Sequence, residues 1–213
     1  MISHQYTPLA NIASTVSKPN FSRRRQQCTL PKLFIFTDPS RSPNLFDLAK
    51  NLPAKSVLVY RHFSESRHKE IAVELKHLCQ QQGAKLLIGA DPKLARIVGA
   101  DGVHLPQSMI KQLPAIQAKY QFSLITCAAH SVSAGRQGIK NGAMAVIVSC
   151  VFPSTSASAS PAMGACRFRN FIKKIDAPVI ALGGINETNV LKLKTACHGV
   201  AIVSGAFKVT AKI

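Results

Sequence analysis

The sequence predicts an α/β protein, a (β/α)8 TIM barrel with a reduced eighth helix and a disordered basic N-terminal tail. From residue 33 onward, eight short apolar runs alternate with seven amphipathic segments. The runs are rich in Val, Ile and Leu and lack a period of two, which is typical of parallel strands covered on both faces. A doubly wound open sheet is the competing architecture. It would normally carry a Gly-rich phosphate turn after its first strand, and residues 37–43, TDPSRSP, do not have that composition.

Residues 1–31 form a block of different composition. They contain no Asp or Glu, are rich in Ser, Asn, Gln and Pro, and include Arg23, Arg24 and Arg25. We interpret them as a flexible basic tail that precedes a single barrel domain over 32–213. An organelle-targeting leader has the same Arg-rich, acid-poor character and stays open as an alternative. The first residues have no basic region followed by a long apolar stretch, so we expect no secretory signal and a cytoplasmic protein.

Each predicted strand is an apolar run of four to nine residues. In order they are 33–38, 56–62, 85–91, 102–106, 123–130, 143–151, 178–185 and 199–207. The eighth run is followed only by KVTAKI, so the last helix is expected to be short or absent.

The predicted helices begin and end at recognisable signals. Ser42 and Pro43 precede the first helix, Gly83 ends the second, and Pro92 begins the third. Pro114 is expected to break the fourth. The seven segments are 44–52, 68–83, 92–99, 108–121, 131–142, 166–176 and 186–197.

The charge is strongly positive, and its meaning is open. Lys and Arg number 27 against nine Asp and Glu, which gives a formal net charge of +18. Such a balance is typical of a nucleic-acid binder, but it also suits a protein that handles phosphorylated small molecules. Trp is absent and aromatic residues make up only 6% of the chain. This scarcity of stacking groups argues against nucleic acid as the partner.

The six cysteines do not form a recognisable metal or redox motif. No two of them lie within four residues of each other, which excludes CxxC and zinc-ribbon patterns. We expect buried free thiols in a reducing compartment. No apolar run approaches the length that a transmembrane helix requires, so no membrane partner is expected.

The C-terminal ends of the strands are where a barrel of this kind holds its reactive groups. Gly183 and Gly184 follow the seventh run, and Val203 and Ser204 lie near the end of the eighth. Backbone N–H groups in such small-residue turns bind phosphate, so we expect these four residues to hold a substrate phosphate. A glycine pair by itself is a weak signal, because any tight turn favours glycine.

Five segments together resemble the thiamine-phosphate synthase and TenI superfamily. They occur in order between residues 33 and 207 and are ADGVHLPQ (100–107), AHS (129–131), VFPSTS (151–156), PVIALGGIN (178–186) and GVAIVSGAF (199–207). The resemblance implies a (β/α)8 barrel that binds a thiazole phosphate. Synthases of the family join this thiazole phosphate to a pyrimidine pyrophosphate with Mg²⁺. TenI-type members tautomerise a thiazole carboxylate phosphate without that partner.

The sequence departs from the synthase pattern where the metal would bind. The positions of the two family carboxylates are Ala90 and Met109, and the family's lysine after the sixth strand is Ala157. Of the basic pattern after the second strand only Arg61 remains. Carboxylates are the groups that hold Mg²⁺ beside phosphate oxygens. We therefore expect no metal, and Asp91 would be the Mg²⁺ ligand only in a divergent synthase.

The resemblance makes His130 the counterpart of the histidine that TenI-type enzymes use to move a proton. A histidine titrating near neutrality suits that chemistry. The alternative is that His130 caps the following helix beside Ser131. His104, inside its strand, is expected to be structural.

The sequence thus predicts a thiazole tautomerase with His130 as acid and base. Arg61, Ser154 and Ser156 are expected to contact the substrate. A Mg²⁺-dependent synthase and a non-catalytic ligand-binding homologue remain alternatives. The sequence does not decide whether the protein forms a homodimer.

Overall fold

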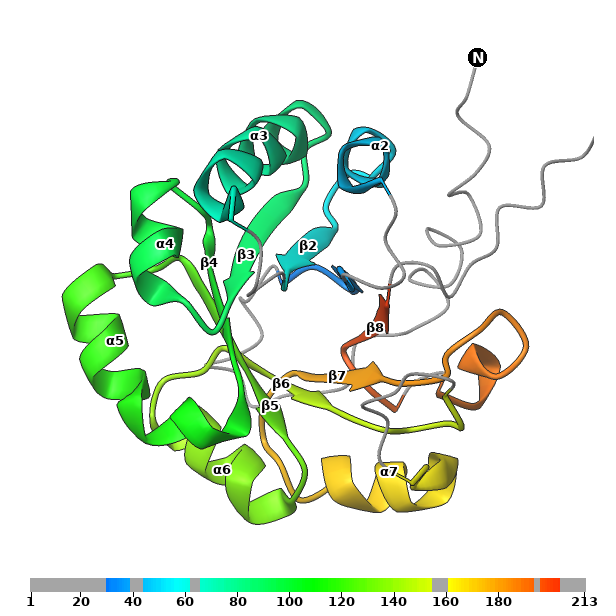
Figure 1. The fold of residues 1–213 in the computed structure, drawn as a ribbon. Coiled ribbons are helices and arrows are strands. Elements are labelled where there is room, and N and C mark those ends of the chain that lie inside the picture. The colour runs from blue at the N-terminus through cyan, green and yellow to red at the C-terminus, as the bar shows by residue number, and fades with distance from the viewer. Residues whose placement is uncertain (1–29, 39–43, 62–65, 155–160, 194–195, 204–213) are drawn as a thin grey trace, which may run out of the picture.

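The chain forms a closed barrel of eight parallel strands in the order β1 to β8, with β8 pairing back onto β1. The structure is a computed structural model, and it describes residues 30–38, 44–61, 66–154, 161–193 and 196–203. Figure 1 looks along the barrel and shows the helices as an outer ring around the strands. The predicted TIM barrel is confirmed.

The strands are shorter than the apolar runs that predicted them. They are β1 (Leu33–Phe36), β2 (Val57–Tyr60), β3 (Lys85–Gly89), β4 (Gly102–Leu105), β5 (Leu124–Ala129), β6 (Ala145–Val148), β7 (Val179–Leu182) and β8 (Gly199–Val203). In the first seven runs, the last described residues leave the sheet and begin the loop that follows it. These loops lie at the C-terminal mouth of the barrel.

The helices are α2 (Leu45–Lys50), α3 (His68–Gln81), α4 (Pro92–Ile97), α5 (Leu113–Tyr120), α6 (Val132–Lys140) and α7 (Gly164–Ile172), with 3-10 helices η2 (Gln107–Gln112) and η3 (Val190–Leu193). Side chains of Asn44, Asp91 and Ser131 accept backbone N–H groups at the starts of α2, α4 and α6. Pro114 lies in the first turn of α5, directly after η2, so the expected break near this proline is present.

One predicted helix is wrong, and two other predicted segments lie outside the described residues. The segment 186–197 was expected to be a helix, but its described residues contain only the 3-10 turn η3. Side-chain oxygens of Asn186 and Asn189 take backbone N–H groups at its start, which favours turns over a regular helix. The reduced eighth helix, 208–213, lies outside the described residues, as do residues 1–29 of the tail.

Two apolar cores hold the barrel together. The inner core fills the barrel with residues of one strand face, among them Phe34, Phe36, Val57, Val59, Leu87, Leu124, Ala145, Ile147, Ile180 and Ala201. The outer core joins the opposite strand faces to the helices. Leu30 belongs to the inner core although it precedes β1, and its carbonyl oxygen lies 3.0 Å from Nε2 of the buried His198. Leu30, which the sequence division assigned to the tail, therefore packs with the barrel.

The described cysteines are free, as expected, but not all are buried. Cys79, Cys127, Cys150 and Cys197 are buried, whereas Cys166 is exposed on α7. The expectation of buried thiols is therefore wrong for Cys166, because α7 turns this residue outward while Phe168 and Phe171 face the core. Among the described residues, none of the helices combines the length and the apolar character that crossing a bilayer requires.

Candidate active site at the mouth of the barrel

The predicted site residues gather at one end of the barrel because all eight strands run in the same direction. Arg61 follows β2, His130 follows β5, Ser154 lies beyond β6, Gly183 and Gly184 follow β7, and Val203 ends β8. Ser156 and Ser204 lie outside the described residues. The mouth thus joins groups that are far apart in the sequence.

The turn after β7 needs both of its glycines. Gly183 and Gly184 have φ angles of 103° and 60°, in the left-handed region that side chains disfavour. A Cβ on Gly184 would collide with the carbonyl oxygens of Phe152 and Pro153, and one on Gly183 would collide with the sulfur of Cys150. The turn is therefore packed directly against the loop that follows β6.

Hydrogen bonds fasten this turn to the β6 loop. The N–H of Val151 donates to the carbonyl of Leu182 at 2.9 Å, and the N–H of Phe152 donates to the carbonyl of Gly183 at 3.1 Å. Ser154 comes two residues after Phe152, so its hydroxyl group lies on the segment that borders the turn. Ser154 is half-buried.

Asn189 holds the next carbonyl of the same turn. Its Nδ2 donates to the carbonyl oxygen of Gly184 at 2.7 Å. Sequence reasoning missed this residue. The spacing Asn186-x-x-Asn189 directly after the glycine turn was the available signal, because asparagines at that spacing commonly bond to nearby backbone.

Arg61 is fixed against the inner wall of the barrel. Its backbone N–H donates to Thr37 Oγ1 at 2.9 Å, and its Nε donates to the Thr37 carbonyl at 3.1 Å. The guanidinium carbon lies 4.9 Å from the centre of the Phe36 ring, a cation–π arrangement. Burial lowers the pKa of Arg61, while the nearby charge of Asp38 acts in the opposite direction. The guanidinium stays charged in this position, because its pKa is high even when lowered.

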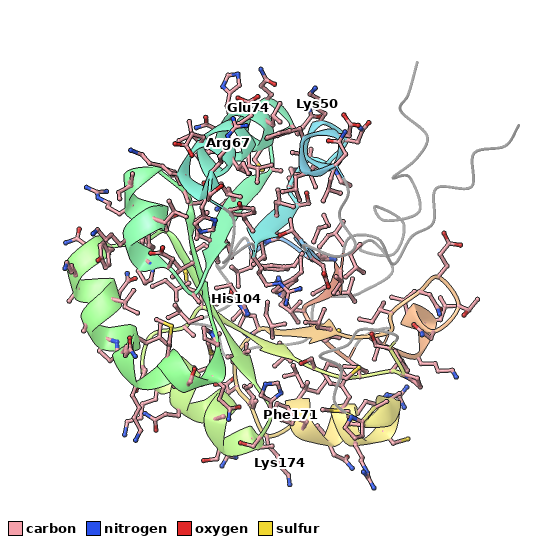
Figure 2. All side chains as sticks on the ribbon, in the orientation of Figure 1. Lys50, Arg67, Glu74, His104, Phe171 and Lys174 are labelled. Atoms are coloured by element: carbon pink, nitrogen blue, oxygen red, sulfur yellow. The ribbon has the colours of Figure 1, made fainter. Side chains whose placement is uncertain are left out.

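His104 lies inside the barrel on β4, as Figure 2 shows, whereas Lys50, Glu74 and Lys174 lie on the outer rim. Its Nδ1 is 2.9 Å from Thr126 Oγ1, and its ring meets the Phe36 ring edge-on at 5.0 Å. Burial and then the charge of Arg61 lower the pKa of His104 to about 3. The imidazole is therefore neutral and packs as part of the inner wall.

His130 lies at the rim and is exposed. Its backbone N–H donates to Gln107 Oε1 at 2.7 Å, which ties the end of β5 to the start of η2. The cap of α6 is Ser131, whose Oγ accepts the N–H of Ala134 at 3.1 Å. Among the described residues, no group hydrogen bonds to the His130 imidazole.

The residues at the positions where the family's synthases hold their metal do not fit Mg²⁺. The side chain of Ala90 has no atom that can bind a metal, and the side chain of Met109 packs against the outer core. Asp91 is engaged as the α4 cap, since its Oδ1 accepts the N–H of Leu94 at 2.8 Å. Within the described ranges no three His, Cys, Asp or Glu side chains gather as a metal site. Mg²⁺ needs carboxylate oxygens directed at it, and this donor set does not supply them.

Comparison with known proteins identifies relatives of one kind. The family model described as thiamine monophosphate synthase, TMP-TENI, matches residues 37–206. A thiamine-phosphate synthase of Listeria monocytogenes is 35% identical over 146 residues, which cover 65% of this chain and 67% of the relative. A thiamine-phosphate synthase of Prochlorococcus marinus is 29% identical over 196 residues, covering 87% of this chain.

Coverage of the relatives is partial, and a solved structure with the same fold is known. The chain spans only 55% of the length of the Prochlorococcus relative. The thiamine phosphate pyrophosphorylase from Pyrococcus furiosus superposes with a TM-score of 0.70 at 24% identity, covering 82% of this chain and 88% of that one.

Proposed function

This chain belongs to the thiamine monophosphate synthase family, and on that premise we propose that it acts in thiamine biosynthesis as a TenI-type thiazole tautomerase. Its substrate would be a thiazole carboxylate phosphate bound at the mouth of the barrel. The observation that favours a tautomerase over a synthase is the lack of carboxylates at the two positions where the synthases of the family hold Mg²⁺. Ala90 and Met109 supply no carboxylate, and Asp91 caps α4.

The phosphate would bind at the ends of β7 and β8. Backbone N–H groups of Gly184 and Val203 suit an anion, and Gly183 lets the chain turn closely enough to reach it. Ser204 would add a hydroxyl donor. Ser154 and Ser156, from the loop after β6, would border the bound substrate.

Arg61 would pair with the substrate carboxylate. Its guanidinium is held by Thr37 and Phe36 before any ligand arrives. A cation held in place in this way loses little rotational freedom when it binds an anion. The neutral His104 below it adds no second positive charge.

His130 would carry the proton. Tautomerisation removes a proton from one substrate atom and returns one to another, so a single imidazole can act first as base and then as acid. His130 has an imidazole without a protein partner among the described residues, and Gln107 fixes its backbone. The chemistry needs no metal.

The decisive experiment measures conversion of thiazole carboxylate phosphate by the wild type and by His130→Asn in the presence of EDTA. We expect turnover by the wild type and a loss of at least about 100-fold in kcat for the variant, the usual contribution of a positioned acid or base. His77→Asn is the matched control, because His77 is also exposed but lies on α3, where it contacts Gln81. Equal turnover of His130→Asn and the wild type would overturn the assignment.

A Mg²⁺-dependent synthase is the second candidate, favoured by the names of the relatives. It would release pyrophosphate from mixed thiazole phosphate and pyrimidine pyrophosphate when Mg²⁺ is added. Asp91→Asn keeps an oxygen that can cap α4 and removes the carboxylate. A Mg²⁺-dependent release of pyrophosphate that Asp91→Asn abolishes would establish the synthase. Binding without either reaction would identify a non-catalytic homologue.

A further inference from the structure

We propose that Asn189 is a positioning residue for the phosphate-binding turn. Its side-chain amide would hold the Gly184 carbonyl so that the N–H groups of the turn stay directed at the ligand. The inference rests on the proposed phosphate site, and it adds a residue that does not itself touch the substrate.

The first step is the orientation of the peptide groups in the turn. In a planar trans peptide the C=O and the following N–H point in opposite directions. The carbonyl of Gly183 accepts from Phe152 in the β6 loop, so the N–H of Gly184 points away from that loop. The carbonyl of Gly184 accepts from Asn189, so the N–H of Ile185 points away from Asn189.

The second step is that these N–H groups remain available. Among the described residues, no acceptor pairs with the N–H of Gly184 or of Ile185. A backbone N–H without a protein acceptor is the group that binds an anion in such turns. Two carbonyl anchors, one from Phe152 in the loop after β6 and one from Asn189, thus set the direction of two neighbouring donors.

The third step is that the Asn189 amide can face the turn in only one way. Its Oδ1 accepts the N–H of Asn186 at 2.9 Å, which leaves Nδ2 to donate to Gly184 at 2.7 Å. The hydrogen bonding is reciprocal, because Oδ1 of Asn186 accepts the N–H of Asn189 at 2.9 Å and the N–H of Thr188 at 3.1 Å. The two asparagines hold each other, and only Asn189 also reaches the glycine turn.

This arrangement provides a matched pair of substitutions. Asn189→Asp keeps the oxygen that accepts from Asn186 but replaces the donor to Gly184 with a second oxygen. Asn186→Asp makes the same chemical change three residues away, and the hydrogen bonds of the Asn186 side chain to Thr188 and Asn189 all run through the oxygen that it keeps. Both variants add one negative charge near the turn, so repulsion of the phosphate is present in each.

The experiment measures the affinity of the wild type and both variants for thiazole phosphate and for the unphosphorylated thiazole alcohol by calorimetry. We expect Asn189→Asp to bind thiazole phosphate about 10-fold more weakly than Asn186→Asp, the effect of misdirecting a donor to a charged group. Affinity for the alcohol should be equal in all three proteins, which separates a change in the turn from general unfolding. Thermal unfolding midpoints of both variants confirm that they fold.

Amide resonances provide a second measurement. In ¹⁵N-labelled wild type, inorganic phosphate should shift the Gly184 and Ile185 amide signals, and Asn189→Asp should reduce those shifts more than Asn186→Asp does. Equal losses of affinity in the two variants, or no loss in either, would overturn the role of Asn189. A wild type that binds neither thiazole phosphate nor phosphate would overturn the phosphate site together with this inference. A wild type that binds but does not turn over its substrate would remove the tautomerase alone.

Discussion

At the scale of single residues, the inner wall of the barrel shows how burial, and then a neighbouring charge, determine the protonation state of a histidine. His104 and Arg61 both contact the ring of Phe36, from β4 and from the end of β2. Only one of two adjacent basic groups can carry a charge cheaply in a buried place. Arg61 keeps its charge, and His104 stays neutral.

This neutrality predicts a stability that depends on pH. The pKa of His104 is about 3 in the folded protein against an ordinary value of 6.5, so the unfolded chain binds the proton first as pH falls. The stability that comes from neutral His104 is complete above pH 6.5 and declines below it, by at most about 1.4 kcal/mol per pH unit. Urea unfolding between pH 7.5 and pH 5 tests this, with His104→Gln as the variant that should show a shallower decline. Identical slopes would contradict the prediction.

The glycine turn provides a second prediction at this scale. Gly184 and Gly99 have nearly the same φ, 60° and 64°, but a Cβ on Gly184 meets backbone oxygens whereas one on Gly99 meets nothing within 4 Å. We expect Gly99→Ala to cost about 1–2 kcal/mol of unfolding free energy for the left-handed conformation alone. Gly184→Ala should cost about 1–3 kcal/mol more because of the collision. Denaturant unfolding of both variants gives the difference, and similar losses would refute the collision.

At the scale of elements, α6 packs against its neighbours so closely that two of its glycines leave no room for a side chain. A Cβ on Gly138 would collide with the sulfur of the buried Cys127 on β5, and one on Gly135 would collide with Ile175. Glycine therefore occurs inside this helix for packing, although it lowers helix propensity. His130 and Ser131 lie between β5 and this helix, at the mouth of the barrel.

This close approach predicts coupling between Gly138 and Cys127. Gly138→Ala should destabilise the protein by about 1–2 kcal/mol, because the overpacking cost exceeds the gain in helix propensity. In a Cys127→Ala background the sulfur is gone, so the same substitution should become neutral or stabilising. A double-mutant cycle by urea unfolding measures the coupling. Additive effects of the two substitutions would show that the helix moves away freely.

The sequence predicted the order of the elements well and their ends less well. The apolar run 178–185 was correctly placed as a strand, but β7 ends at Leu182 because Gly183 and Gly184 turn the chain. The run remains apolar through Ile185, which packs in the outer core, so hydrophobicity alone does not mark where pairing stops. The segment 186–197 failed as a helix because its asparagines bond to local backbone instead.

At the scale of the whole molecule, one long stretch of the chain carries basic residues and no acidic ones. Residues 102–175 contain eight Lys and Arg and no Asp or Glu, and the helices α5, α6 and α7 of this stretch lie along one side of the barrel in Figure 1. Lys76 and Asp101 form an ion pair at 2.8 Å, and the same carboxylate accepts the N–H of Leu86 at 2.9 Å. Like charges that outnumber charges of opposite sign repel one another in the folded state.

This imbalance predicts that salt stabilises the protein. Raising NaCl from 0.1 M to 1 M shortens the screening length from about 10 Å to about 3 Å, so the thermal midpoint should rise by a few degrees. The double variant Lys140→Glu and Lys173→Glu should be more stable at low salt and gain less from added salt. Thermal melts of both proteins across the salt series test this. A midpoint that stays constant or falls would contradict net repulsion.

The sequence by itself predicted the barrel, the order of its strands and the edge at which a site would lie, because eight apolar runs that alternate with amphipathic segments favour parallel strands whose C-terminal ends meet at one edge. It also placed Gly183, Gly184, Arg61 and His130 at that edge. Only the tertiary structure decided that Arg61 rests on Phe36 above a neutral His104, that Asp91 serves α4, and that Asn189 anchors the glycine turn. Most of these contacts join residues from different strands and loops, and their energies depend on distance and burial, which no pattern along the chain contains.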